Sequence, residues 1–166
     1  MDNKFFIFLD IDGVLNDENY ALKCYKRHHV KGIMSCQNMP FNPKSLNNLM
    51  KLYQYIKKKE YKPIIVLSST WRLNSIDIAI INARLAEYGM SVREKTSTGP
   101  DRGLEIVTYL TNNAKENDKY IILDDETFDF SEMGIIDHLI QTSFVKSGFN
   151  KQAFKKALKY VNNLIN

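Results

Sequence analysis

At 166 residues the chain has the length of one domain, and none of its apolar runs approaches the roughly 20 residues needed to span a bilayer. Its 44% hydrophobic content, 25% charged content and net charge of +4 are typical of a soluble globular protein and lack the strong basic bias of a dedicated nucleic-acid binder. Because the N-terminus lacks a secretory signal pattern and Cys24 and Cys36 lack zinc or disulfide spacing, we expect a cytoplasmic protein without membrane contact.

The first predicted elements are a buried strand over residues 4–10 and a helix over residues 42–59, with an irregular stretch at 17–41 between them. The strand is predicted because five consecutive apolar residues run directly into an acidic pair. The helix is predicted because Asn42 can cap it, Pro43 suits its first position, and apolar residues follow at helical spacing.

The rest of the chain continues to alternate apolar runs with helical stretches. We predict strands at 63–68, 90–93, 119–124 and 138–141, and helices at about 74–88, 101–113 and from Asn150 to the C-terminus. Strands that are apolar on both faces indicate a parallel sheet covered on both sides. The expected fold class is therefore α/β: a Rossmann-like three-layer sandwich with a central, mostly parallel five-stranded sheet, in a single domain over residues 1–166.

Polar side chains gather where the predicted strands end, which is where ligands bind in such sheets. In chain order they are Asp10 and Asp12, Ser68 and Ser69, Arg102, and Asp124 and Asp125. Four carboxylates in one crevice repel one another strongly without a cation, and hard oxygen ligands suit Mg²⁺. A hydroxyl and a basic side chain beside that metal would form a site for a phosphate dianion.

The order of these motifs resembles the haloacid dehalogenase (HAD) superfamily of phosphotransferases. Asp10-Ile11-Asp12-Gly13-Val14-Leu15 is similar to the first signature of that superfamily, and Val66-Leu67-Ser68-Ser69 to the second. Arg102 stands where the third signature usually has lysine, and Ile121-Ile122-Leu123-Asp124-Asp125 resembles the fourth, with Asp129 completing its acidic spacing. The segments LDIDGVLN, LSSTWR, RGLEI, ILDDE and HLIQTS together resemble the small uncapped HAD domain of Swiss Army Knife RNA repair proteins.

The resemblance implies a Mg²⁺-dependent phosphatase that forms an aspartyl-phosphate. It implies that Asp10 is the nucleophile and that Asp12 is the acid and base. The metal would be held by Asp10, by the main-chain carbonyl of Asp12, and by Asp124 or Asp125. Without an acid at the position of Asp12, members of the superfamily tend to act on other leaving groups, so its presence favours phosphoryl transfer.

The same resemblance assigns a phosphate-binding role to three side chains. Ser68 is expected to donate to a phosphoryl oxygen because it directly follows the strand, and Ser69 is the alternative. Arg102 is expected to neutralise the charge that grows in the transition state, with Lys95 as the reserve candidate. Trp71 and Arg72 are left with two interpretations, substrate binding or packing at the start of a helix.

The substrate is the least determined part of the interpretation. Residues 17–41 and 93–101 are the gaps where relatives carry cap domains, and both are too short for one. We therefore expect an open site with a flap at 17–41, which suits a bulky phosphorylated partner such as an RNA or DNA end. A nucleotide or small-molecule phosphatase is the alternative, and a non-catalytic binding or regulatory module is the alternative of another class.

Other interpretations of single motifs explain less. A calcium loop would need further alternating acids, a two-component receiver domain would not repeat the acid pair after the fourth strand, and a metal-dependent nuclease would not need Ser68. Tyr20, Tyr25 and His28 are expected to pack loosely in the loop, and stacking on a substrate base is the alternative. The lysines at 57–62 and at 151–159 are expected to form two solvated helix faces, and a nucleic-acid surface is the alternative, for which the basic bias of the sequence is too weak.

Overall fold

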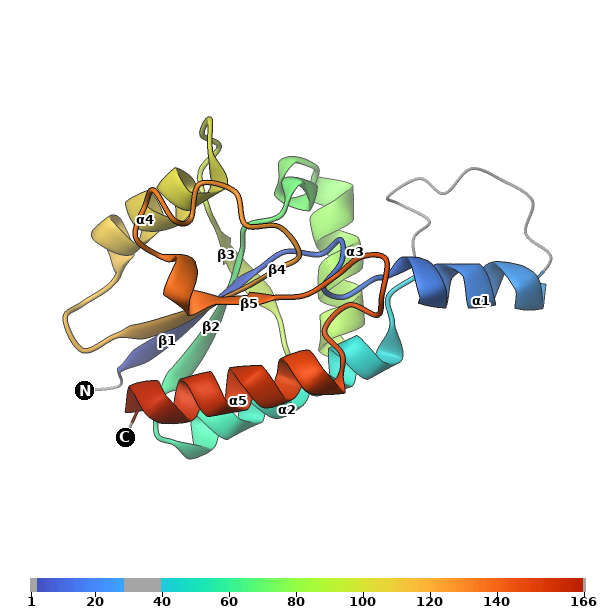
Figure 1. The fold of residues 1–166 in the computed structure, drawn as a ribbon, viewed down its shortest axis with the longest axis horizontal. Helices are drawn as coiled ribbons and strands as arrows, with labels where there is room; N and C mark the ends of the chain where they lie inside the picture. The colour runs from blue at the N-terminus through green and yellow to red at the C-terminus, as the bar shows by residue number, and fades with distance from the viewer. Residues whose placement is uncertain (1–2, 29–39, 166) are drawn as a thin grey trace.

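The computed structural model describes residues 3–28 and 40–165, which form a three-layer α/β sandwich (Figure 1). All five strands are parallel, in the order β3-β2-β1-β4-β5. The strands are β1 (Lys4–Leu9), β2 (Lys62–Leu67), β3 (Val92–Lys95), β4 (Lys119–Asp124) and β5 (Leu139–Gln141). The helices are α1 (Glu18–His28), α2 (Pro43–Lys58), α3 (Ser75–Ala86), α4 (Arg102–Asn113) and α5 (Lys151–Ile165), with short 3₁₀ helices η2 (Thr70–Leu73) and η3 (Ile136–His138).

Strand β1 lies at the centre of the sheet, which explains why its sequence does not alternate between apolar and polar residues. It pairs with β2 on one side and with β4 on the other, and residues 5–9 are completely buried. Ile7 and Leu9 face α2, α3 and α5, whereas Phe6 and Phe8 face α4. A strand that is covered on both faces must be apolar at every position.

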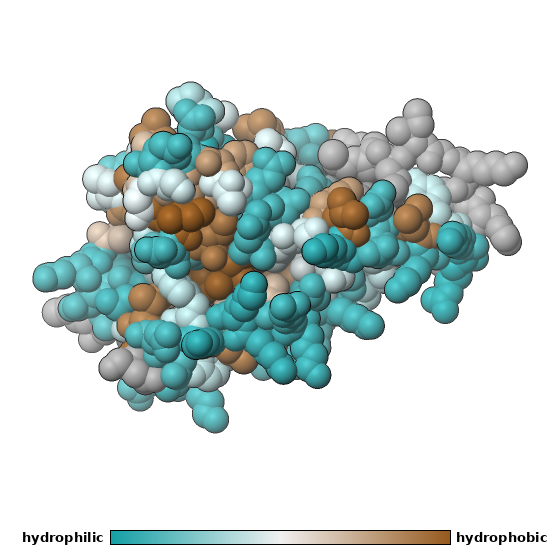
Figure 2. Space-filling view, in the orientation of Figure 1, coloured by the Kyte–Doolittle hydropathy of each residue, from teal (hydrophilic) through white to brown (hydrophobic). Residues whose placement is uncertain are grey.

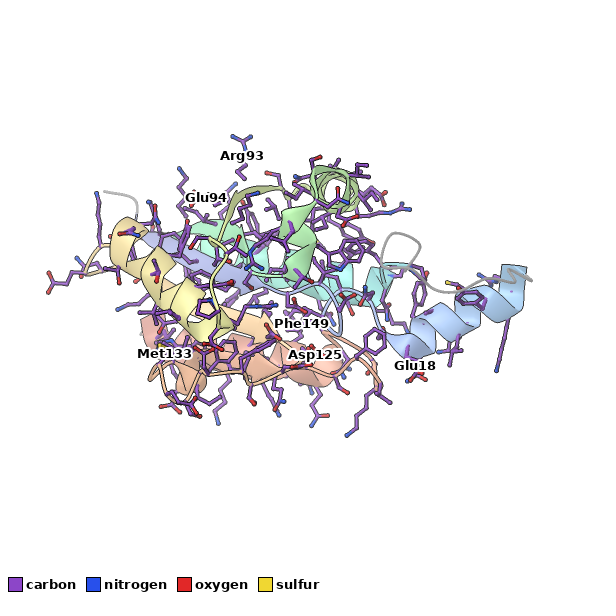
Figure 3. All side chains as sticks on the ribbon, turned by 90° about the horizontal axis from the view of Figure 1, so that it is seen from above. Glu18, Arg93, Glu94, Asp125, Met133 and Phe149 are labelled. Atoms are coloured by element: carbon purple, nitrogen blue, oxygen red, sulfur yellow. The ribbon has the colours of Figure 1, made fainter. Side chains whose placement is uncertain are left out.

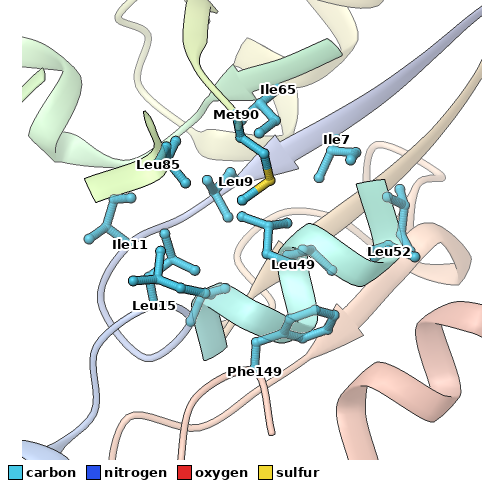
Figure 4. Packing of buried hydrophobic residues seen from close by; sticks show 14 of the residues in the cluster. Ile7, Leu9, Ile11, Leu15, Leu49, Leu52, Ile65, Leu85, Met90 and Phe149 are labelled. Carbon is cyan, nitrogen blue, oxygen red and sulfur yellow. The ribbon is translucent and has the colours of Figure 1, made fainter. Parts of the chain in front are cut away.

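The larger part of the core lies on the side of the sheet that α2, α3 and α5 cover. Figure 4 shows Ile7 and Leu9 of β1 packing there with Leu49 of α2 and with Met90. On the opposite side, α4 and the segment after β4 contribute Ile106, Tyr109, Phe130 and Ile135 to a smaller cluster. The expected α/β sandwich is thus confirmed, and no cap domain is evident within residues 3–28 and 40–165.

The prediction of an irregular stretch at 17–41 was wrong for its first part. Residues 18–28 form α1, because the Asp17 side chain accepts a hydrogen bond from the Tyr20 backbone N–H at 2.9 Å and so caps the first turn. This helix extends away from the sheet in Figure 1. Residues 29–39 and the side chain of His28 lie outside the described part, so the expected flap stays a prediction.

The strand predicted at 90–93 was displaced by about two residues. The strand runs over Val92–Lys95, because the backbone N–H of Val92 is held by the Asn82 side chain at 2.8 Å and Met90 turns into the core. None of the helices within the described residues is both long and apolar enough to cross a bilayer.

Asn42 joins three segments next to the end of β1. Its backbone N–H donates to the Leu15 carbonyl at 2.7 Å, and its side-chain oxygen accepts from the Lys44 backbone N–H at 3.0 Å as the N-cap of α2. The side-chain nitrogen donates to Asp17 at 2.6 Å, and both side chains are buried. One residue therefore fixes the loop after β1 and the starts of α1 and α2.

Replacement of Asn42 should destabilise the fold more than the loss of an ordinary helix cap. We expect Asn42→Ala to lower the free energy of unfolding by about 2–4 kcal/mol, because it removes a cap and takes the Asn42 donor away from the Oδ2 atom of the buried Asp17. Asn74→Ala removes the cap of α3, where the bond to Ile76 is exposed, and should cost only about 1 kcal/mol. Equal losses for the two variants in urea unfolding would contradict this assignment.

Candidate active site

The carboxyl ends of β1, β2 and β4 meet at one edge of the sheet. The ladder continues one residue past β1, since the Asp10 backbone N–H donates to the Leu123 carbonyl at 3.0 Å. It also continues past β2, since the Ser68 backbone N–H donates to the Leu9 carbonyl at 3.1 Å. These bonds bring Asp10, Ser68 and Asp124 side by side at the ends of three adjacent strands.

Three carboxylates converge at this edge. One oxygen from each of Asp10, Asp124 and Asp125 lies within 4.8 Å of the others. Seen from above, Asp125 lies between Met133 and Glu18 (Figure 3). Burial raises the pKa of Asp10 to about 6, and burial together with the Asp10 charge raises the pKa of Asp124 to about 8. Such a cluster resists full ionisation unless a cation lies next to it.

Arg102 supplies a positive charge to this cluster from the first turn of α4. Its Nη1 lies 3.1 Å from Asp10 Oδ1 and 2.9 Å from Asp124 Oδ2, and its side chain is 9% exposed. The Arg102 charge lowers the pKa of both carboxyls and so opposes the effect of burial. Lys95, the reserve candidate, instead donates to the Arg72 carbonyl at 3.1 Å. Of the two, Arg102 is the side chain that contacts the acidic cluster.

The position of Arg102 is fixed by the segment that follows β4. The ring of Phe128 covers the guanidinium at 4.7 Å from its centroid, and Phe128 adopts a positive φ of 39°. Asp129 accepts from the backbone N–H groups of Gly103 at 2.6 Å and Leu104 at 3.0 Å. Asp129, which the sequence grouped with the acidic motif, therefore caps α4. It is not part of the cluster formed by Asp10, Asp124 and Asp125.

Two glycines permit these close approaches. A Cβ at Gly13, where φ is 72°, would lie 2.4 Å from the Asp125 carboxyl group, so a side chain there would displace Asp125 from the site. A Cβ at Gly103 would lie 2.8 Å from the Asp129 carboxylate that caps the helix. Gly13 directly follows the acid pair, and its positive φ is a conformation that glycine adopts readily.

The Asp12 side chain lies apart from the three clustered carboxylates and has its own partners. The indole N–H of Trp71 donates to Asp12 Oδ2 at 2.9 Å, and the Asn16 side-chain nitrogen donates to Asp12 Oδ1 at 2.7 Å. Asn16 also accepts from the Gly13 backbone N–H at 3.1 Å, and Trp71 packs against Phe41. Trp71 therefore contacts a predicted site residue, and Asn16 is a partner that the motifs did not reveal.

The two serines after β2 have different surroundings. Ser69 hydrogen bonds to the Asp10 carboxyl group and lowers its pKa, and its hydroxyl also caps η2 through the Trp71 backbone N–H at 3.5 Å. The hydroxyl of Ser68 is buried and has no hydrogen-bond partner among the described residues. The geometry thus brings Ser69 to Asp10, while Ser68 retains an unused donor at the same edge.

Arg72 holds the segment that carries the serines. Its guanidinium donates to the carbonyls of Ser68 and Ser69, both at 2.8 Å, and forms an ion pair with Glu105 of α4 at 2.6 Å. Glu105 also accepts from the Gly99 backbone N–H at 2.8 Å. Of the two interpretations left open for Arg72, the structure shows packing, because the side chain is buried and both of its terminal nitrogens donate within the protein.

A family model described as the HAD domain in Swiss Army Knife RNA repair proteins matches residues 6–154. The matched range includes the site residues, from Asp10 to Asp129. No curated protein and no solved structure matches the chain.

The role of Asp129 as a remote cap of α4 can be tested by comparing it with Asp101, the residue that directly precedes the helix in the sequence. Asp101 is the formal N-cap of α4, but its side chain makes no capping bond. We expect Asp129→Ala to lower the free energy of unfolding by about 1–2 kcal/mol and Asp101→Ala to change it by less than about 0.5 kcal/mol. A larger loss for the Asp101 variant in chemical unfolding would show that the cap is assigned to the wrong residue.

Proposed function

Because the chain belongs to the family of HAD domains in Swiss Army Knife RNA repair proteins, we propose that it is a Mg²⁺-dependent phosphomonoester hydrolase that acts through an aspartyl-phosphate. The observation that carries this proposal is the contact of Arg102 with both Asp10 and Asp124. A nucleophilic carboxylate, a fixed cation and additional oxygen ligands are thereby gathered in one crevice.

The donor set of the cluster fits a hard divalent cation. Asp10, Asp124 and Asp125 supply carboxylate oxygens within 4.8 Å of one another, and the main-chain carbonyl of Asp12 is a further candidate ligand. Mg²⁺ prefers such oxygen ligands and retains several of its waters. When bound, the ion would offset the repulsion between the anionic Asp10 and an anionic phosphate ester.

The proposed chemistry uses the two acids after β1 in two steps. An oxygen of Asp10 attacks phosphorus while the bond to the leaving oxygen breaks, and Asp12 gives that oxygen a proton. A water molecule then attacks the phosphorus of the aspartyl-phosphate, Asp12 takes up its proton, and Asp10 is released together with inorganic phosphate. Atoms and protons balance over the cycle, which leaves both acids as they began.

The partners of Asp12 fix the orientation of its carboxyl group. Both of its oxygens accept hydrogen bonds from N–H donors, of Trp71 and of Asn16. In the proposed mechanism these two donors hold Asp12 in place while it exchanges a proton with the leaving oxygen and with water.

Arg102 and the serines complete the proposed phosphate site. Arg102 lies against Asp10 and would neutralise the negative charge on the transferring phosphoryl group. Ser69 already contacts the Asp10 carboxyl group and would donate to a phosphoryl oxygen, and the unpaired hydroxyl of Ser68 is a second donor. Arg72 contributes indirectly, since it fixes both serine carbonyls.

We further propose that the substrate is the phosphorylated end of an RNA or DNA strand. The description of the family, with its RNA repair proteins, supports this choice. A second support is that no cap domain covers the site within residues 3–28 and 40–165, because a bulky polymer end requires an approach that a cap would obstruct.

The nucleophile assignment predicts the behaviour of Asp10→Asn. The wild-type chain should release phosphate from p-nitrophenyl phosphate with Mg²⁺ present, and EDTA should abolish that release. The Asn variant should be slower by about 10³-fold or more, because its amide cannot form the phosphoryl intermediate. Asp101→Asn is the matched control, since it removes one exposed acid near the start of α4. Release by a folded Asp10→Asn protein at the wild-type rate would overturn the mechanism.

The substrate proposal predicts the outcome of a direct comparison of kcat/KM. Oligonucleotides with a 5′ or a 3′ phosphate should be better substrates than mononucleotides and sugar phosphates, by about tenfold or more, because remote binding energy lowers the barrier. A preference for mononucleotides, or no preference, would reject the strand end and leave the hydrolase assignment intact.

A further inference from the structure

A groove of about 580 Å³ runs between α2 and α5. Four lysines line it, two from each helix: Lys44, Lys51, Lys151 and Lys155. All four are exposed, no acidic residue lines the groove, and none of the four makes an ion pair with a described residue. Figure 2 shows the hydrophilic surface that gathers over the N-terminal half of α5.

The charged residues on these two helices are all basic. Eight of the 23 basic residues lie on α2 and α5, which together carry none of the 19 acidic ones. The remainder of the chain is therefore net negative, although the whole chain has a charge of +4. A small net charge thus conceals a basic face, which is why composition did not indicate a binding surface.

The fold brings together two pairs of lysines, Lys44 with Lys51 and Lys151 with Lys155, that are separated by about a hundred residues in the sequence. The hydroxyl of Tyr55 on α2 donates to the Asn162 side chain on α5 at 3.0 Å. Lys151 and Lys155 are four positions apart on one helix, where like charges repel and destabilise the helix. Of the two expected lysine faces, the one at 151–159 contributes Lys151 and Lys155 to the groove, whereas the one at 57–62 lies outside it. A bound polyanion would offset the repulsion among the four lysines of the groove.

The groove begins at the edge of the sheet that carries the site. Both α2 and α5 start there, so the positive ends of their dipoles add to the lysine charges. Asn48, which lines the groove, donates to the Phe149 carbonyl at 2.9 Å, and the Phe149 backbone N–H donates to the Val14 carbonyl at 2.8 Å. Val14 lies two residues after Asp12, so the groove borders the loop that follows the acid pair.

We propose that this groove binds the sugar-phosphate backbone of a nucleic-acid strand whose phosphorylated end reaches Asp10. As a statement about the substrate of that site, the inference rests on the proposed function. Lysine ammonium groups act as point charges for successive phosphodiesters, and such contacts position a strand without reading its bases. The binding is therefore independent of sequence and sensitive to salt.

The test is a binding measurement that does not depend on hydrolysis. A labelled single strand of about 15 nucleotides without a terminal phosphate is titrated with the full chain, and fluorescence anisotropy reports affinity across a range of salt concentrations. Four lysine contacts predict that log K falls with log salt with a slope of about −3. The variant Lys51→Glu/Lys155→Glu should bind about tenfold or more weakly, with a shallower slope.

The chain offers a matched control on the same two helices. Lys57 and Lys156 are also exposed, one on α2 and one on α5, but neither lines the groove. Lys57→Glu/Lys156→Glu changes the net charge by the same amount and should weaken strand binding by less than about twofold if charge position decides. Lys51→Gln/Lys155→Gln repeats the experiment without charge reversal, in case the first variant does not fold.

Three outcomes would overturn the inference. Equal losses for the groove pair and the control pair would show that net charge alone attracts the strand, and unchanged binding by the groove pair would show that the strand lies elsewhere. Complete displacement of the bound strand by anionic lipid vesicles would show that the groove binds a membrane surface instead. If the chain hydrolyses no phosphomonoester but binds through the groove, only the proposed function fails.

Discussion

The site depends on one electrostatic constraint, the crowding of carboxylates at the buried end of β1. Asp10 and Asp124 are almost completely buried, and burial together with the Asp10 charge raises the pKa of Asp124. Arg102 contacts both and offsets part of this cost without leaving its own helix. A buried charge is tolerated only when its partner is held firmly, so the placement of Arg102 governs much of the surrounding structure.

Two sets of contacts hold the two sides of the site to α4. On one side, Phe128 and Asp129 fix the first turn of the helix, and the Gly103 position leaves room for the capping carboxylate. On the other side, Glu105 anchors Arg72, which in turn fixes the serine segment. A single helix thus connects the segment after β4 with the segment after β2, and contacts from both segments end on it.

The sequence predicted the fold and three of the four acids expected in the crevice, because those signals are local, whereas the Asp12 side chain lies outside the cluster. Apolar runs define strands, and the carboxyl ends of parallel strands share an edge, so Asp10 and Asp124 were predicted to meet. The contacts of Asp129 and Glu105 with distant backbone groups have no such local signature. Helix α1 was overlooked although Asp17 stands in capping position, because its residues are predominantly polar and bury little apolar surface.

The segment between Asp124 and Asp129 serves two purposes within a few residues. Asp124 and Asp125 belong to the acidic cluster, and Asp129 caps the helix that carries Arg102. Insertion or deletion of one residue between them would shift either the carboxylates or the cap. Evolution can therefore vary the chain length of this segment very little, because any change in length would have to preserve both the acidic cluster and the cap of α4.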